Sequence, residues 1–213
     1  MRYYLSSYRM GDRVDDLVRM TGPGARVAVV SNALDFIPMA AREAYARTVY
    51  DQLAEFTDRG LVAEDLDLRD YFGRTEALAA ALSGVGLVWA TGGNSFLLRR
   101  AMRESGLDGI LLARLAEDSL VYGGYSAGAC VAGPSLRGIE MMDAPDQVAV
   151  VYGLEPEWEG LGLVEFAIVP HFESQHAEAE AAARTAAAMA AAGQAHRTLR
   201  DGEAIVRWDG NGL

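Results

Sequence analysis

"VYGGYSAGACVAG", Val121 to Gly133, carries the pattern of a strand that turns sharply into a helix. An apolar run leads into Gly124, Ser126 and Gly128, and small residues that favour a helix follow. In a G-x-S-x-G pattern the glycines leave room for a strained turn, from which the serine hydroxyl projects at the edge of a sheet. The stretch therefore predicts a nucleophile at Ser126, provided that the chain supplies a base; the alternative is a tight turn that happens to contain a serine.

The rest of the chain alternates short apolar runs with longer amphipathic stretches. The expected strands include residues 26–33, 85–90 and 162–170, and the expected helices include 40–59 and 175–192. This βαβ alternation predicts an α/β fold with a mainly parallel sheet flanked by helices on both faces. We expect a single domain over residues 1–213, because this length allows one sizeable core.

The C-terminal stretch "AIVRWDGNGL" reads as a strand followed by a strong hairpin turn signal at residues 209–212. No return strand follows before Leu213. We therefore expect a C-terminal hairpin that is truncated in this sequence.

Charge and composition narrow the classes of partner. The formal net charge of −11 disfavours nucleic acid and anionic membrane surfaces, which both attract clustered Lys and Arg. No apolar run approaches the length of a membrane span, and the N-terminus lacks the apolar core of a signal peptide. The single Cys130 excludes an internal disulfide and a multi-cysteine metal site. We expect a cytoplasmic protein; a homodimer is a hypothesis, since the sequence does not report the oligomeric state.

A serine nucleophile needs a base, and the chain has three histidines. His171 directly follows the apolar run "FAIVP", at the kind of strand end where open α/β sheets bind ligands. His176 begins an Ala-rich helix and is expected to be a solvated surface residue, and His196 fits a loop or a strand start. His171 is therefore the candidate base; the alternative is a histidine at a strand end with no chemical role.

The third member of a triad would be an acid that orients the imidazole. Spacing alone does not choose among the seven acids between Ser126 and His171, which are Glu140, Asp143, Asp146, Glu155, Glu157, Glu159 and Glu165.

A second glycine-containing loop, "WATGGNSF", follows another expected strand. The amide of Gly93 in this loop and the amide of Ala127 after the serine are candidate donors of an oxyanion hole. The alternative is a tight turn in which Asn94 or Ser95 caps the next helix.

Three motifs in order, "ATGGNSFLL", "GGYSAGACVAGPSLR" and "AIVPHFE", resemble the S51 serine peptidases, a group with aspartyl dipeptidases and cyanophycinases. The opening "YYLSSYRMG" is similar to the first strand of this group. The resemblance implies a fold like that of class I glutamine amidotransferases and a Ser-His-acid triad without metal or organic cofactor. It makes Ser126 the nucleophile and His171 the general base, with the Gly93 and Ala127 amides as the oxyanion hole.

The resemblance also proposes an acid and a substrate. After "PSLR" (Pro134 to Arg137), the segment "GIEMMDAP" offers Asp143 as the acid, with Glu140 as the alternative. Family members cleave short peptides after an N-terminal Asp or act on β-aspartyl-arginine units, so a small peptide is the expected partner. Asn94 and Arg137 are the candidate substrate-binding residues, and a surface ion pair with Glu140 or Asp143 is the alternative for Arg137.

Two other functions stay open from the sequence. One is a small-molecule esterase of the α/β-hydrolase type, which shares the order Ser, acid, His. The other is a non-catalytic member of the same fold that binds peptides or amino acids.

Overall fold

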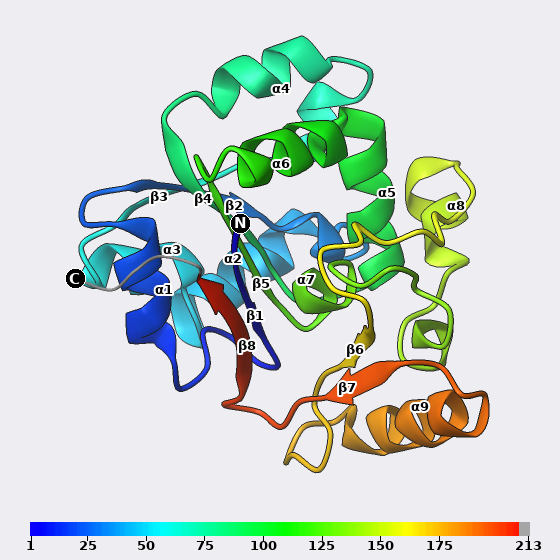
Figure 1. The fold of residues 1–213 in the computed structure, drawn as a ribbon. Helices are drawn as coiled ribbons and strands as arrows, with labels where there is room; N and C mark the ends of the chain where they lie inside the picture. Colours follow the sequence, from blue (N-terminus) through cyan, green and yellow to red (C-terminus); the bar gives the residue numbers. More distant parts are fainter. Residues whose placement is uncertain (209–213) are drawn as a thin grey trace.

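The computed structural model describes residues 1–208 and places six strands in one central sheet, in the order β3-β2-β4-β5-β1-β8 (Figure 1). Five of them run parallel, and β8 at the edge pairs antiparallel with β1. The prediction of a mainly parallel sheet is confirmed. The strands are β1 (Arg2–Ser6), β2 (Arg26–Val30), β3 (Val62–Asp65), β4 (Val85–Ala90), β5 (Val121–Tyr125) and β8 (Ala204–Trp208). The turn signal at residues 209–212 lies outside the described residues.

A second, two-stranded sheet pairs β6 (Ala167–Val169) in parallel with β7 (His196–Thr198). The α-helices are α1 (Val14–Thr21), α2 (Met39–Thr48), α3 (Gln52–Asp58), α4 (Thr75–Ala81), α5 (Ser95–Ser105), α6 (Leu107–Ala116), α7 (Ala127–Cys130), α8 (Gln147–Tyr152) and α9 (Ala179–Ala191). Three short 3-10 helices are η1 (Asn32–Leu34), η2 (Leu68–Tyr71) and η3 (Ile139–Met141).

Helices cover both faces of the central sheet because alternate residues of each buried strand point to opposite sides. Val27 and Leu87 pack in one buried cluster with residues of α1 and α3. Ala28 and Val88 pack in a larger cluster on the other face, with α4, α5 and α6. The sheet therefore has no solvent-facing side along its central strands, as its apolar sequence predicts.

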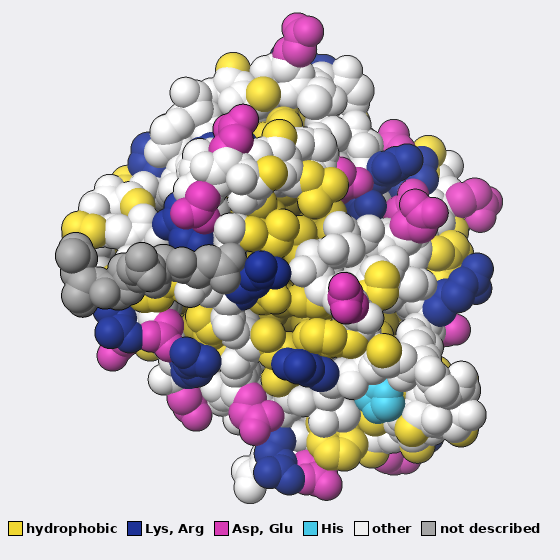
Figure 2. Space-filling view, in the orientation of Figure 1, with side chains coloured by type: hydrophobic (Ala, Val, Ile, Leu, Met, Phe, Trp, Pro, Cys, Tyr) yellow, Lys and Arg dark blue, Asp and Glu magenta, His cyan; other side chains and the backbone are white. Residues whose placement is uncertain are grey.

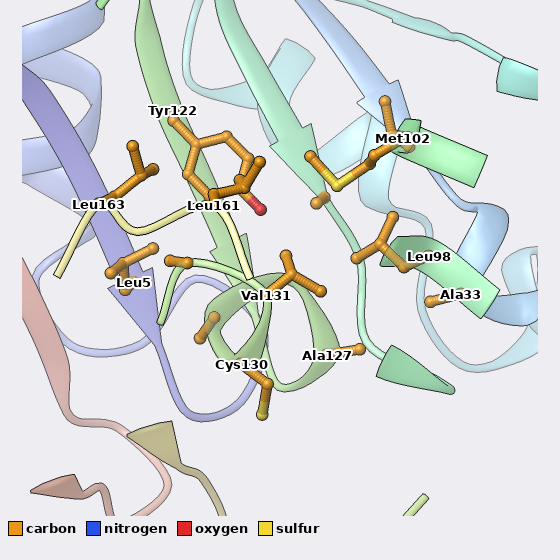
Figure 3. Packing of buried hydrophobic residues seen from close by; sticks show 14 of the residues in the cluster. Leu5, Ala33, Leu98, Met102, Tyr122, Ala127, Cys130, Val131, Leu161 and Leu163 are labelled. Atoms are coloured by element: carbon orange, nitrogen blue, oxygen red, sulfur yellow. The ribbon is translucent and has the colours of Figure 1, made fainter. Parts of the chain in front are cut away.

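The turn from β5 into α7 is packed into the larger cluster. Figure 3 shows Val131, just after α7, pointing toward Leu98 and Met102 of α5. Tyr122 of β5 is fully buried and donates a hydrogen bond from its hydroxyl to the carbonyl of Gly128 at 2.7 Å. The short α7 is therefore held firmly against β5 and α5.

Two expected elements differ in the structure. The helix expected over 40–59 divides into α2 and α3, because Asp51 interrupts it and caps α3 by accepting hydrogen bonds from the amides of Leu53 and Ala54. The strand expected over 162–170 shortens to β6, which joins β7 in the small sheet and not the central one.

The visible surface carries charges of both signs. Figure 2 shows acidic and basic side chains interspersed around a central area where hydrophobic side chains gather. Within residues 1–208, no helix combines the length and the apolar character that crossing a bilayer requires.

Candidate active site

Ser126 lies on a strained turn at the carboxyl end of β5. Its backbone has φ 49° and ψ −111°, a conformation that residues with a side chain rarely adopt. The flanking glycines permit the turn, because a Cβ at Gly124 would lie 2.8 Å from the carbonyl oxygen of Ala90 and one at Gly128 only 2.2 Å from it. The backbone N–H of Ser126 is shared between the carbonyls of Ser6 and Ser7, at the end of β1. The sharp turn predicted from the sequence is thus present in the structure.

His171 reaches Ser126 from the loop that follows β6. Its Nε2 lies 3.1 Å from the Ser126 hydroxyl oxygen, and its ring is buried. The backbone of His171 has a positive φ of 60°, so both residues of this pair occupy strained conformations. The structure brings together the two residues that the sequence proposed as nucleophile and base.

The acid on the other side of the imidazole is Asp201. Its Oδ1 lies 2.8 Å from His171 Nδ1. Because an ionised carboxylate only accepts hydrogen bonds, Nδ1 carries the proton of the neutral ring, and Nε2 is left to accept the Ser126 hydroxyl proton. Asp201 is itself fixed, since its backbone N–H donates to the Ser174 hydroxyl at 2.7 Å.

Asp143 and Glu140, the acids proposed from the sequence, accept backbone N–H groups elsewhere. Their assignment as the acid on His171 is therefore corrected. The Asp143 carboxylate accepts the backbone N–H of Ser95 at 2.9 Å, at the start of α5. Glu140 accepts the backbone N–H of Gly138 in its own turn. Burial raises the pKa of Asp143 to about 6.

Asp201 follows His171 in the chain and so lies outside the segment between the serine and the histidine in which the sequence predicts the acid. Its place beside His171 depends on the pairing of β6 with β7, where Val169 is opposite Thr198. His171 follows the first strand by two residues and Asp201 follows the second by three, so parallel pairing carries both to one end of the small sheet.

The backbone amides of Gly93 and Ala127 stay candidates for an oxyanion hole. Neither N–H has an acceptor within residues 1–208. Gly93 has φ 132°, and a Cβ there would lie 2.5 Å from the carbonyl oxygen of Ala33, so this position requires glycine. Gly93 lies with Ser126 in the wall of one cavity, and Ala127 begins α7, where the helix dipole favours negative charge.

Asn94 and Arg137, the proposed substrate-binding residues, have structural partners. The Asn94 side-chain oxygen accepts the amides of Phe96 and Leu97, so it caps α5. Its side-chain nitrogen donates to the Ala144 carbonyl and to Gln147. The guanidinium of Arg137 lies over the Trp158 ring, 5.1 Å from its centroid. Neither residue is in the wall of the cavity that Gly93 and Ser126 line: the first is a helix cap and the second packs on an aromatic side chain.

A cavity of about 350 Å³ opens beside Ser126 and His171. Its wall includes two residues that the sequence analysis did not propose for the site, Arg42 and Glu178. His176, expected to be a surface residue, lies in this wall with its ring stacked on that of His171. An aromatic ring, Tyr8, contacts both imidazoles from the side.

Burial changes the acid–base behaviour of the site. It lowers the pKa of His171 below its ordinary value of 6.5, although the hydrogen bond that His171 Nδ1–H donates to Asp201 acts in the opposite direction. Burial and the nearby charge of Asp201 raise the pKa of Glu178. The imidazole is therefore neutral near pH 7, the form in which Nε2 can accept a proton.

Comparisons with known proteins agree with the resemblance. The family model described as "Peptidase family S51" matches residues 26–212. A curated "Peptidase E" of Streptomyces coelicolor is 33% identical over 150 residues, covering 67% of this chain and 58% of the relative. An uncharacterised peptidase of Listeria innocua is 32% identical over 118 residues, covering 54% of this chain. The match spans about half the length of this and a second Listeria relative (52% and 53%).

Solved structures show the same fold. A protein from Listeria monocytogenes, named as a peptidase E candidate, superposes with a TM-score of 0.74 over 97% of both chains at 20% identity. A peptidase from an acI-B1 Actinobacterium gives a TM-score of 0.65, at 14% identity, over 97% of this chain and 82% of the other. The α/β fold is shared with both, and the match of the family model over most of the length shows that this chain belongs to peptidase family S51.

Proposed function

We propose that this protein is a serine peptidase that hydrolyses short peptides, most readily dipeptides with an N-terminal Asp. The observation that carries the proposal is the hydrogen-bonded series Ser126, His171 and Asp201 at the wall of a cavity. This order of groups is what a serine needs to act as a nucleophile, since its hydroxyl is otherwise a weak one.

In the proposed reaction, His171 Nε2 takes the proton of Ser126 as the hydroxyl oxygen attacks the scissile carbonyl carbon. The amides of Gly93 and Ala127 bind the oxyanion that develops. His171 then donates its proton to the leaving amine, and an acyl-enzyme forms on Ser126. Water, deprotonated by the same imidazole, then attacks the acyl carbon, and the imidazolium returns this proton to the Ser126 oxygen as the acid product leaves. Asp201 holds the tautomer and stabilises the protonated ring at each stage.

The cavity supports a small substrate with an acidic group. Its volume of about 350 Å³ lies at the small end of ligand sites. Arg42 of α2 lies in its wall, and we assign to it the binding of the substrate's acidic group, in place of Arg137. The Nη1 of Arg42 lies 3.4 Å from Asp35, while its buried Nε has no hydrogen-bond acceptor among the described residues. A guanidinium with unused donors suits a substrate carboxylate.

The test is a panel of Asp-X, Glu-X and neutral dipeptides with short esters alongside, assayed with the wild type, Ser126→Ala and Ser83→Ala. Ser83 is exposed and outside the cavity, so its variant controls for loss of a serine hydroxyl. We expect Asp-X cleavage by the wild type and Ser83→Ala, and a loss of at least about 10⁴-fold in Ser126→Ala. A fluorophosphonate reagent should label Ser126, as read by peptide mass spectrometry.

The substrate class is tested by Arg42→Ala, with Arg47→Ala on the same helix as the matched control. Arg47 is exposed, and its guanidinium lies 3.7 Å from the carboxylate of Glu43. We expect kcat/KM to fall selectively for Asp-X in Arg42→Ala. Cleavage that survives Ser126→Ala, or a panel in which no peptide is cleaved, contradicts the peptidase mechanism; cleavage of esters alone supports the esterase.

A further inference from the structure

We propose that His171, His176 and Glu178 form a binding site for Zn²⁺ in the cavity, and that the bound ion blocks the Ser126–His171 pair. The inference about binding stands on the geometry alone, and the inference about inhibition rests on the proposed peptidase function. The donor atoms of the three side chains all lie within 4.8 Å of one another.

The arrangement of the rings brings the donors together. The imidazoles of His171 and His176 are stacked with centroids 3.7 Å apart and planes 11° apart. An oxygen of Glu178 lies 3.9 Å from His171 Nε2. Two ligands of a tetrahedral zinc ion lie about 3.3 Å apart, given bonds of about 2.0–2.1 Å, so the donors must approach by up to about 1.5 Å. The His176 ring must also turn out of the stack, because the lone pair of a ring nitrogen lies in the plane of its ring.

The segment between β6 and α9 can supply this movement through His176, which lies outside any regular element. Glu178 is the N-cap of α9, where its carbonyl accepts the backbone N–H of Ala182, so its adjustment comes from its partly exposed side chain. The movement costs one hydrogen bond, which His176 Nδ1 accepts from the backbone N–H of Glu178 at 3.2 Å. His171 itself needs no adjustment, since it is buried and held by Asp201.

The donor set selects the kind of ion. Two imidazoles and a carboxylate are a common zinc set, whereas Mg²⁺ and Ca²⁺ prefer oxygen ligands alone. The carboxylate of Asp201 on His171 Nδ1 has the position that orients metal-binding histidines in zinc proteins. All three ligands lie in the cavity wall, so water can take the fourth position.

Binding at this site has a direct chemical consequence. Coordination uses the Nε2 lone pair of His171, the same pair that would accept the Ser126 proton at 3.1 Å. One atom cannot hold the ion and act as the base, so a zinc-bound molecule has no general base. We expect reversible inhibition that a chelator relieves.

Binding is measured by calorimetry with ZnCl₂ on the untagged full chain and on Ser126→Ala, which keeps the three ligands. Separate variants change one ligand each, His176→Ala and Glu178→Gln, and His196→Ala is the matched control because this histidine lies in β7, outside the cluster. We expect one zinc ion per chain, an affinity at least about 10-fold weaker in each ligand variant, and an unchanged affinity in the control. Thermal unfolding checks that every variant is folded.

The inhibition is measured with the peptide that is cleaved fastest, as the ratio of the activity with Zn²⁺ to the activity without it. EDTA is then added to test whether the activity returns. The half-inhibitory concentration should match the calorimetric Kd and rise with it in the ligand variants. Equal affinity in His176→Ala, Glu178→Gln and the wild type, equal loss in His196→Ala, or equal binding of Mg²⁺ overturns the site. Zinc binding without peptide cleavage supports the zinc site and refutes the proposed function. Peptide cleavage without zinc binding supports the proposed function and refutes the zinc site.

Discussion

At the scale of single residues, the choice of acid decides how the imidazole is held. Asp201 contacts His171 Nδ1 at 2.8 Å, whereas Asp143 serves the Ser95 amide. Asp201→Asn keeps the shape but replaces an acceptor-only carboxylate with a neutral amide, whose NH2 can donate to Nδ1 and favour the wrong tautomer, so we expect kcat to fall by about 10³–10⁴-fold. Asp143→Asn, the matched variant, keeps an oxygen for Ser95 and should stay within about 3-fold of the wild type. Steady-state kinetics with one peptide decide between them, and the opposite ranking contradicts the assignment.

The pH dependence follows from the state of the same imidazole. The general base must be neutral, so activity rises as pH increases through the pKa of His171. Since burial lowers this pKa, we expect the acid limb of kcat/KM to have its inflection below pH 6.5. The hydrogen bond that His171 Nδ1–H donates to the Asp201 carboxylate raises the pKa of His171, so the limb should move further down in Asp201→Asn. An inflection above 6.5 in the wild type contradicts the burial argument.

At the scale of elements, the contact between α7 and β4 sets the position of the nucleophile. A Cβ on Gly128 would lie 2.2 Å from the Ala90 carbonyl oxygen, and α7 cannot move away without carrying Ser126 with it. We expect Gly128→Ala to reduce the free energy of unfolding by about 3 kcal/mol and to lower activity.

The control for this change is Gly109→Ala, within α6. Nothing lies within 4 Å of a Cβ at Gly109, and alanine favours a helix over glycine by up to about 1 kcal/mol. Urea denaturation should therefore show a small gain for Gly109→Ala and a large loss for Gly128→Ala. Equal effects of the two substitutions would mean that the close approach of α7 and β4 does not hold the turn.

The same elements show what the sequence could predict. The apolar run at Val85–Ala90 and the G-x-S-x-G turn carry local signals, because burial and glycine geometry act within a few residues. The split between α2 and α3 depends on the helix cap at Asp51. The apolar residues keep a helical spacing across this position, so their pattern predicts one continuous helix. Asp201 depends on the pairing of two strands far apart in the chain, which no local pattern reports.

At the scale of the whole molecule, the end of β1 connects three distant parts of the chain. The carbonyls of Ser6 and Ser7 accept the backbone N–H of Ser126. The Ser7 hydroxyl accepts the backbone N–H of His171 at 2.8 Å and donates to the carboxylate of Asp201 at 2.9 Å. Ser7, which follows β1, therefore fixes the relative positions of the nucleophile, the base and the acid, which come directly after β5, after β6 and after β7.

Ser7 is accordingly a positioning residue, and Ser7→Ala tests whether this connection sets the geometry of the site. Its hydroxyl is buried, so its removal should cost about 1–3 kcal/mol of stability by leaving the His171 amide unpaired. We expect kcat to fall by about 10-fold with little change in KM, since small misplacement of a base affects the transition state most. Ser6→Ala is the matched control: its hydroxyl is also in a buried residue but donates to the Arg9 carbonyl, away from the imidazole. A merely structural role for Ser7 predicts that both variants lose stability and that both keep the wild-type kcat in the folded fraction.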